Sequence, residues 1–319
     1  MINNPSLTLV FVCLFVCLFV CLFVCLFVSF FLSFVNRPAL FEKLRQHCRV
    51  NEGDYVASLE LNRLQCLNSD SKSGQAFWVS TDGSLVVKTV KHYEAKTLRK
   101  LLDSYALHVL SGPSTIGNIL GLYRVRGRYP GSRYILVCKN VFPAPSIPCE
   151  KYDLKGSTVG RLAATSSAVA KDLNVLQSNK HFALGQSGKT AILQVLTRDT
   201  EWLAKWSLMD YSLLVAVEPV RNSEPSRFSR HESGSKGGSD LGDCTLSASN
   251  QDGGKLVILS PVSRLVYHMG VIDFLQVYSF RKRLETWMKC LYSDGKRISS
   301  VAPKFYARRL LEFIASVTN

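Results

Sequence analysis

The sequence predicts an α+β fold of two lobes, with an antiparallel sheet in the first lobe, mixed α/β structure in the second, and an apolar segment before both. A strand pair, a helix and a further strand follow one another in the first half, Pro143 and Pro145 then mark a crossing, and helical and strand-like runs alternate in the second half. The 319 residues are enough to bury a large core. We therefore divide the chain into an apolar segment at 1–36, a first lobe at 37–145 and a second lobe at 146–319.

The first lobe contains a predicted helix, a hairpin, a second helix and an apolar strand. Two strand-like runs flank a Thr-Asp-Gly-Ser turn, which is typical of a β-hairpin. The later strand should end before the prolines, because proline cannot donate to a strand ladder. In chain order the patterns cover Leu40–Arg45, Gly74–Ser80, Leu85–Val90, Lys91–Leu110 and Tyr134–Phe142.

The second lobe combines a helix, strands and an insert. Apolar residues recur at helical spacing from Ala191 to Lys205, directly before Met209. Residues 222–254 are rich in Ser and Gly and almost without large apolar side chains, so we expect a disordered insert. The pattern becomes foldable again at Lys255.

Residues 185–190, Gly-Gln-Ser-Gly-Lys-Thr, resemble a phosphate-binding P-loop. That pattern requires glycine at position 183, where Ala183 stands, and no predicted strand precedes it. We therefore interpret these residues as an ordinary loop.

The apolar segment has the length of a membrane-spanning helix. No charged residue occurs from Leu7 to Val35, and the tetrapeptide Cys-Leu-Phe-Val repeats within it. About 20 apolar residues span a bilayer. Basic residues follow the segment and none precedes it, which by the positive-inside rule leaves the remainder in the cytosol. A perfect repeat is equally typical of translated repetitive DNA or a mis-assigned start, so both interpretations stay open.

Composition favours a polyanionic partner. The formal net charge of +15 suits nucleic acid, an anionic membrane surface or a phosphorylated substrate, although solubility alone also explains it. No zinc-finger, RNP or glycine-clamp pattern is present, so we expect no nucleic-acid partner. Four of the ten cysteines lie in the apolar repeat and the rest form no CxxC pair, which indicates free thiols rather than a zinc or disulfide framework.

Three short motifs carry the chemistry of the second lobe. Phosphoryl transfer needs cations to hold a polyphosphate, and carboxylates to hold Mg²⁺ and orient the attacking hydroxyl. A carboxylate with apolar neighbours is costly to bury without partners, which indicates a cleft. The motifs Tyr152–Arg161, Met209–Leu214 and Val271–Phe274 supply these groups in Asp153, Lys155, Asp210 and Asp273.

These motifs resemble those of the phosphatidylinositol phosphate kinase family. The matching strings are Asp-Leu-Lys-Gly-Ser-Thr from Asp153, Met-Asp-Tyr-Ser-Leu-Leu from Met209, and Ile-Asp-x-Leu-Gln from Ile272, and the likeness covers about residues 39–319. The resemblance implies a protein-kinase-like fold, with ATP and Mg²⁺ as cofactors. It is closest to type I phosphatidylinositol-4-phosphate 5-kinases, which convert the 4-phosphate lipid to the 4,5-bisphosphate.

The resemblance also implies roles for the second-lobe residues. Asp210 would orient the inositol hydroxyl, and Asp273 would hold Mg²⁺. Lys155, beside Asp153 on the same predicted strand, would contact the transferred phosphoryl group or the lipid phosphate.

Lys88 is the corresponding candidate in the first lobe. It lies in the strand-like run Leu85–Val90, from which its ammonium would reach phosphates under the hairpin turn. The order of residues supports a nucleotide site, since Gly74 lies upstream where a covering hairpin is expected and Glu94 begins the next helix. The resemblance implies that Lys88 binds ATP, and we interpret Glu94 as its ion-pair partner.

The segment from Tyr278 to Lys289 is basic and contains Trp287. We expect it to be the loop that meets a phosphoinositide in an anionic membrane and selects the substrate. Arg-Leu-Glu at this point resembles the type I sequence, which implies phosphatidylinositol 4-phosphate as substrate. The residues assigned to lipid contact and selection are Arg281, Lys282, Arg283, Glu285 and Lys289.

Two other functions remain as alternatives. A protein serine/threonine kinase would carry Asn shortly after its catalytic Asp, and residues 213–216 contain none. A catalytically impaired scaffold that only binds phosphoinositides stays open, because the family's usual amino-terminal region is replaced by the apolar repeat. Homodimerisation stays open for the same reason. We expect the kinase domain to act at the cytosolic face of a membrane, the plasma membrane in particular.

Overall fold

The computed structural model describes residues 32–34, 37–67, 75–116, 119–126, 132–142, 149–164, 169–220, 255–260, 263–278 and 302–319. The predictions about Gly74, the insert at 222–254 and the basic loop residues 281–289 therefore lie outside the described residues. Most of the apolar segment does so too.

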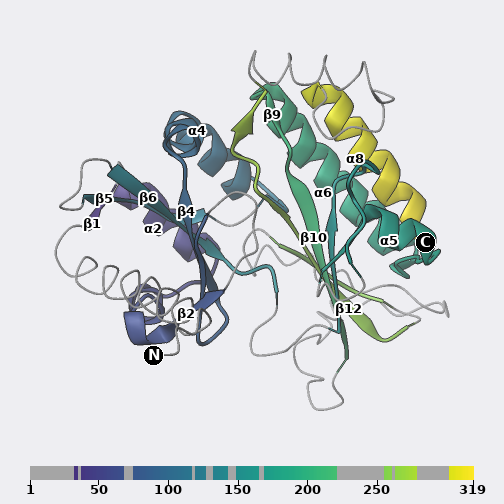
Figure 1. Cartoon of the computed structure of the whole chain (residues 1–319), viewed down its shortest axis with the longest axis horizontal. Helices are drawn as coiled ribbons and strands as arrows, with labels where there is room; N and C mark the ends of the chain where they lie inside the picture. Colours follow the sequence, from purple (N-terminus) through teal and green to yellow (C-terminus); the bar gives the residue numbers. More distant parts are fainter. Residues whose placement is uncertain are drawn as a thin grey trace, which may run out of the picture.

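The first lobe is built on a six-stranded antiparallel sheet (Figure 1). The predicted hairpin is present, and Gly83 in its turn has a φ of 70°, which glycine adopts without strain. Sequence patterns did not identify three of its strands, at residues 32–34, 64–67 and 119–126. In spatial order the strands are β1 (Leu32–Phe34), β5 (Ile119–Arg126), β6 (Ser132–Lys139), β4 (Leu85–Val90), β3 (Phe77–Ser80) and β2 (Leu64–Leu67).

The helices of the first lobe cover this sheet. Helix α2 (Pro38–His47) and helix α4 (His92–Leu110) confirm two predicted helices, and α3 (Glu52–Ser58) is an additional one. The side chains of Leu85 and Val87 on β4 pack into a cluster with Tyr55 of α3. Because side chains alternate along a strand, Lys88 points from the opposite face of the sheet.

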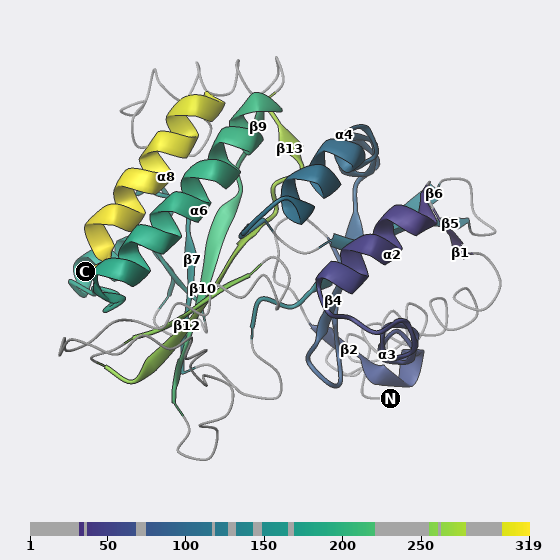
Figure 2. The same ribbon diagram turned by 180° about the vertical axis from the view of Figure 1, so that it is seen from behind.

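The second lobe contains a five-stranded sheet in which every strand pair is antiparallel except β7 with β8. Helices α6 (Gly185–Lys205) and α8 (Pro303–Val317) lie side by side against it (Figures 1 and 2). The short helix α5 (Asp172–Gln177) follows β8. In spatial order the strands are β11 (Leu256–Leu259), β12 (Leu265–Ile272), β10 (Ser212–Pro219), β7 (Glu150–Leu154) and β8 (Ala170–Lys171).

A small two-stranded ribbon of the second lobe contacts the first lobe. Strand β9 (Leu208–Met209) pairs with β13 (Gln276–Val277), and this ribbon lies beside α4 (Figure 2). The hydroxyl of Tyr93 on α4 donates to Gln276 Oε1 at 3.1 Å. Helix α4 therefore contacts the second lobe at the edge where the candidate aspartates lie.

Two sequence interpretations need correction. Residues 185–190 form the first turns of α6, so their assignment to a loop is wrong. Gly188 permits the helix there, because it lets α6 approach β11 closely and a Cβ would lie 3.0 Å from Ile258 Cγ2. Residues 32–34 of the apolar segment are extended and pair with β5 rather than forming part of a helix. No helix in the described ranges is long and apolar enough to cross a bilayer.

Candidate functional site

The register of the first-lobe sheet fixes the position of Lys88. Lys88 pairs with Phe77 at the start of β3, and Phe77 pairs with Leu67 at the end of β2. Lys88 thus lies at the end of the β3–β4 hairpin opposite its turn. This register does not support the expectation that phosphates bound by Lys88 would lie under the turn at 81–84. Gly74, which was predicted to cover the nucleotide, lies outside the described residues, so its position relative to Lys88 stays a prediction.

Lys88 reaches across to the second lobe. Its Nζ lies 2.5 Å from Asp273 Oδ1 and donates a hydrogen bond to it. Burial would lower the pKa of Lys88, but the Asp273 carboxylate outweighs this effect and raises it. Burial would likewise raise the pKa of Asp273, yet the Lys88 charge holds it below its usual range.

Glu94 is not the partner of Lys88 that we expected. Its Oε2 accepts the backbone N–H of Lys91 at 2.7 Å and the side chain of Gln75 at 3.1 Å. The bond to the Lys91 N–H caps the first turn of α4. Glu94 acts on Lys88 only through its charge, which contributes to raising the lysine pKa.

Asp210 and Asp273 lie at adjacent ends of paired strands. Ser212 of β10 pairs with Ile272 of β12, so Asp210 precedes this point on one strand and Asp273 follows it on the other. Both have left-handed backbone, with φ of 65° and 59°. That conformation is uncommon for residues other than glycine and is tolerated best by Asp and Asn. The backbone bends at Asp210 between β9 and β10, and it bends again at Asp273 between β12 and β13.

Lys155 forms an ion pair with Asp210, as Lys88 does with Asp273. Strand β7 ends at Leu154, which lies opposite Leu213 of β10, and Lys155 follows directly. Lys155 Nζ donates to Asp210 Oδ1 at 2.8 Å and to the Asp210 carbonyl at 2.7 Å. The Lys155 charge also contributes to lowering the pKa of Asp273, so the two ion pairs belong to one cluster.

Asp172 holds the backbone after β7 in place. This fully buried carboxylate accepts the N–H groups of Lys155 at 2.9 Å and Gly156 at 2.7 Å, and Arg161 Nε at 2.7 Å. A buried charge of this kind persists only when its hydrogen bonds are satisfied. The arrangement fixes the direction from which Lys155 reaches Asp210. Sequence reasoning missed Asp172, because nothing local distinguishes it from a surface acid at a helix start.

Helix α8 packs directly against this loop. Gly156 has a φ of +65°, and a Cβ there would lie 2.8 Å from the carbonyl oxygen of Arg309. Tyr306 of the same helix donates its hydroxyl to the carbonyl of Tyr211, the residue after Asp210. The terminal helix therefore supports both the Lys155 loop and the Asp210 bend.

Asp153 has a different neighbour from the one we expected. Arg161 lies 3.3 Å from its carboxylate and also donates to its backbone carbonyl. Among the contacts of the described residues, Asp153 thus pairs with Arg161 rather than with the lysine–aspartate cluster. We interpret Asp153 as a residue that holds the loop carrying Lys155 in place through Arg161. The structure does not support the catalytic role predicted for Asp153.

The donor chemistry fits Mg²⁺ at Asp273. The carboxylate is a hard oxygen ligand, and 53% of its side chain is exposed. No cluster of three or more His, Cys, Asp or Glu side chains suited to a metal occurs in the described part of the chain. One carboxylate, with the remaining positions filled by phosphates and water, is a usual arrangement for Mg²⁺.

Chemically, the cluster presents two cations and two carboxylates at the boundary of the lobes. Lys88 and Lys155 supply positive charge from opposite lobes, and Asp210 and Asp273 supply acceptors between them. This set suits transfer of a phosphoryl group, in which the protein contributes positioning and charge rather than covalent chemistry.

Comparison with known proteins agrees with this geometry. Residues 58–317 match the family model described as phosphatidylinositol-4-phosphate 5-kinase. The chain is 30% identical to a probable phosphatidylinositol phosphate kinase of Dictyostelium discoideum over 88% of its length and 47% of that protein.

Two further relatives carry different substrate names. The chain is 32% identical to phosphatidylinositol 4-phosphate 5-kinase type-1 beta of Gallus gallus, over 87% of the chain and 56% of the relative. It is 29% identical to phosphatidylinositol 5-phosphate 4-kinase type-2 alpha of Sus scrofa, over 88% of the chain and 76% of that protein. The chain thus spans about half the length of the first relatives. On its motifs, its two-lobed kinase-like fold and these matches, it belongs to the phosphatidylinositol-4-phosphate 5-kinase family.

Proposed function

We propose that the chain is a lipid kinase that moves the γ-phosphate of ATP to the 5-hydroxyl of phosphatidylinositol 4-phosphate, giving phosphatidylinositol 4,5-bisphosphate. The observation that carries the proposal is the pair of left-handed aspartates, Asp210 and Asp273, at the paired ends of β10 and β12. Each contacts a lysine, and the two lysines come from different lobes. Family membership supports a phosphoinositide as acceptor.

The positions of the four side chains suggest a division of roles. Lys88, on the first-lobe sheet, would bind the phosphates of ATP, and Asp273 would hold Mg²⁺, which when bound neutralises charge on those phosphates. Asp210 would accept a hydrogen bond from the inositol hydroxyl and orient it. Lys155, already 2.8 Å from Asp210, would stabilise charge on the transferred group.

The choice of phosphatidylinositol 4-phosphate rests on the segment after Tyr278. Its Arg281, Lys282, Arg283 and Lys289 would meet anionic lipid, and Glu285 matches the type I sequence. A carboxylate among these cations would orient those that receive the lipid phosphate. We place this action at the cytosolic face of the plasma membrane. A phosphoinositide-binding scaffold without turnover is the second candidate, since these basic residues would bind anionic lipid whether or not phosphate is transferred.

Label transfer from [γ-³²P]ATP separates these functions. Vesicles containing one phosphatidylinositol monophosphate and a soluble basic protein would be offered together. We expect the lipid alone to be labelled, and the label to be lost with Asp210→Asn. Label on the protein would identify a protein kinase instead. Vesicle binding without any label would leave the scaffold.

A further inference from the structure

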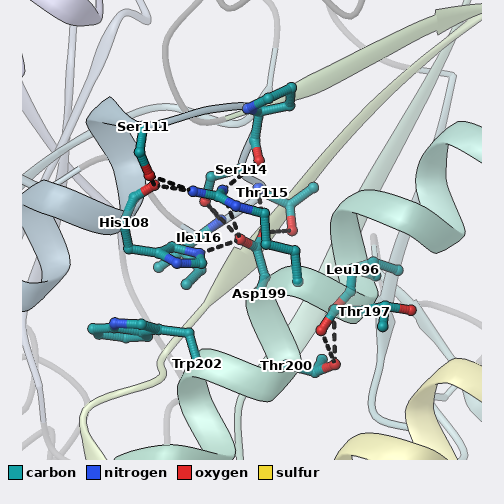
Figure 3. Close-up of polar contacts among 12 residues, drawn as sticks. His108, Ser111, Ser114, Thr115, Ile116, Leu196, Thr197, Asp199, Thr200 and Trp202 are labelled. Carbon is teal, nitrogen blue, oxygen red and sulfur yellow. Dashed lines mark hydrogen bonds and ion pairs between the residues drawn. The ribbon is translucent and has the colours of Figure 1, made fainter.

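Asp199 of α6 is a buried carboxylate outside the cluster described above. Its side chain is 0% exposed. Apart from its neighbour Arg198, its side-chain partners come from the end of α4 and the segment that leads from α4 to β5 (Figure 3). A second-lobe helix thus holds a first-lobe segment through one acidic residue.

Four hydrogen bonds converge on this carboxylate. His108 Nε2 lies 2.7 Å from Oδ1, and the Ser114 hydroxyl donates to Oδ1 at 2.9 Å. Thr115 donates its backbone N–H at 2.5 Å and its hydroxyl at 2.7 Å to Oδ2. Figure 3 shows these bonds pointing from the first-lobe segment into one turn of α6.

The adjacent Arg198 strengthens the same junction. Its guanidinium donates to the carbonyl of Pro113 at 2.7 Å, to the Ser111 hydroxyl at 2.8 Å and to the carbonyl of His108. Two consecutive residues of α6 therefore fix the segment 108–115. Arg198 donates hydrogen bonds to it, and Asp199 accepts hydrogen bonds from it.

The fixed segment in turn contacts the strand that carries Asp273. The Thr115 carbonyl accepts the backbone N–H of Val271 at 2.5 Å, and Ile116 forms a parallel bridge with Val271. Only Ile272 separates Val271 from Asp273. On the other side of Asp273, Phe274 stacks on Tyr105 of α4, with ring centroids 6.0 Å apart.

We propose that Asp199 is a positioning residue for phosphoryl transfer, which holds Ser114 and Thr115 against β12 and so sets where Asp273 lies relative to Lys88. The inference rests on the proposed function for its catalytic consequence, though not for the contacts themselves. An apolar side chain could fill the same space, but it would leave the Ser114 hydroxyl and the Thr115 N–H and hydroxyl without this acceptor, so the carboxylate holds the segment by more than packing. The Asp199 carboxylate holds the segment in one arrangement. The hydrogen bond between the Thr115 carbonyl and the Val271 N–H then fixes β12 against this segment.

The test compares Asp199→Asn with Thr200→Val. Thr200 is the next residue of α6, equally buried, and among the described residues its hydroxyl donates to the Leu196 and Thr197 carbonyls of its own helix (Figure 3). Asp199→Asn keeps the shape and one acceptor oxygen but removes the charge. Four quantities are measured: kcat, KM for ATP, the Mg²⁺ concentration for half-maximal rate, and hydrogen exchange at the Val271 amide.

We expect Asp199→Asn to lower kcat by roughly tenfold to a hundredfold, because a small misplacement of a reacting group has that effect. KM for ATP should change little, the Mg²⁺ concentration for half-maximal rate should rise, and the Val271 amide should exchange faster. Thr200→Val should leave all four quantities near wild type. Equal behaviour of the two variants, or a loss of kcat with unchanged exchange at Val271, would overturn the proposal.

Milder variants keep the test decisive if Asp199→Asn does not fold. Ser114→Ala and Thr115→Val each remove one hydroxyl bond to Asp199 and leave the carboxylate in place. The proposal expects a smaller loss of kcat from each, with Val271 exchange raised in step, and wild-type values for both would contradict it. Wild-type protein without lipid kinase activity would refute the proposed function, whereas exchange at Val271 would still show whether Asp199 fixes β12.

Discussion

At the scale of single residues, the left-handed backbone of Asp210 and Asp273 separates function from stability. Asn adopts this conformation about as readily as Asp, so Asp210→Asn and Asp273→Asn should preserve both bends. Each removes a charge needed to orient the hydroxyl or hold the metal. We expect losses of kcat of order 10³ or more, with thermal unfolding close to wild type.

Steady-state rates and thermal unfolding of both variants check this prediction. Asp210→Ala serves as a control for the backbone, because alanine tolerates the left-handed region poorly and should lower the unfolding temperature as well as the rate. A variant with Asn that retained about a tenth of the wild-type rate would show that its role is wrong, since a group that orients the hydroxyl or holds the metal should contribute about 10³ or more.

Asp82 provides a prediction about pH. In the hairpin turn its carboxylate accepts hydrogen bonds from Ser58, Ser80 and Ser84. Burial alone would raise its pKa, but these bonds lower the pKa from 3.8 to about 2. A carboxyl whose pKa is depressed in the folded state stabilises the protein above pH 4 and loses this contribution as the pH falls towards 2.

We therefore expect Asp82→Ala to destabilise the protein by about 1 kcal/mol at pH 6, a value that allows for the exposure of this side chain. The difference from wild type should shrink between pH 4 and pH 2.5. Denaturant unfolding at several pH values measures it. A difference that stays constant across this range would show that the bonds to Asp82 do not depend on its charge.

Single residues also show what sequence reasoning can predict. Lys88, Lys155, Asp210 and Asp273 were predicted because each lies in a short motif with apolar neighbours. Asp172 and Asp199 were not, because their importance comes from partners distant in the chain; Asp199 and Thr115 are 84 residues apart. The expected Lys88–Glu94 pair failed because Asp273, from the other lobe, lies nearer in space.

At the scale of elements, register decided what local pattern left open. The hairpin itself was predicted from its turn, but only the pairing of Lys88 with Phe77 shows at which end the lysine lies. Likewise, residues 185–190 carry two glycines that favour a loop locally, and packing of α6 on β11 overrides that preference.

The contact of α8 with the loop after β7 gives a prediction with a matched control. Gly156 and Gly160 have φ of +65° and +66°, but only a Cβ at Gly156 would meet the backbone of α8; at Gly160 nothing lies within 4 Å. Gly160→Ala should therefore lose about 1 kcal/mol from its backbone conformation alone. Gly156→Ala should lose roughly a further 1–3 kcal/mol from overpacking.

Thermal or denaturant unfolding of the two variants provides the comparison, and the rate provides a second measure. Gly156→Ala should also lower kcat, because it displaces the backbone that aims Lys155 at Asp210, whereas Gly160→Ala should not. Equal losses of stability in both variants would mean that α8 does not press on this loop.

At the scale of the whole molecule, the excess of positive charge has a predicted use. We expect the chain to bind anionic vesicles through Arg281, Lys282 and Arg283, and to be released as ionic strength rises, because exposed charges are screened. Replacing the three by alanine should weaken sedimentation with vesicles.

A control of equal charge makes this test specific. Lys96, Arg99 and Lys100 are exposed on α4 in the first lobe, and changing these three to alanine removes the same charge elsewhere. Binding that falls equally in both triple variants would indicate attraction by net charge alone rather than by a lipid-facing loop.

The two-lobed organisation was predictable because strand pair, helix, strand and proline crossing follow in order. The way the lobes meet was not, since it depends on contacts such as Lys88 with Asp273 and Thr115 with Val271, which join residues more than a hundred positions apart. These contacts bring the separate motifs into one site.

The most direct test of the proposed reaction offers the protein both monophosphorylated lipids at once. Mixed vesicles with equal amounts of phosphatidylinositol 4-phosphate and 5-phosphate are incubated with labelled ATP, and the position of the new phosphate on the product is determined. We predict transfer to the 5-hydroxyl of the 4-phosphate lipid, and a relative shift towards the 5-phosphate lipid in Glu285→Ala. Faster labelling of the 5-phosphate lipid by the wild-type protein would contradict the account.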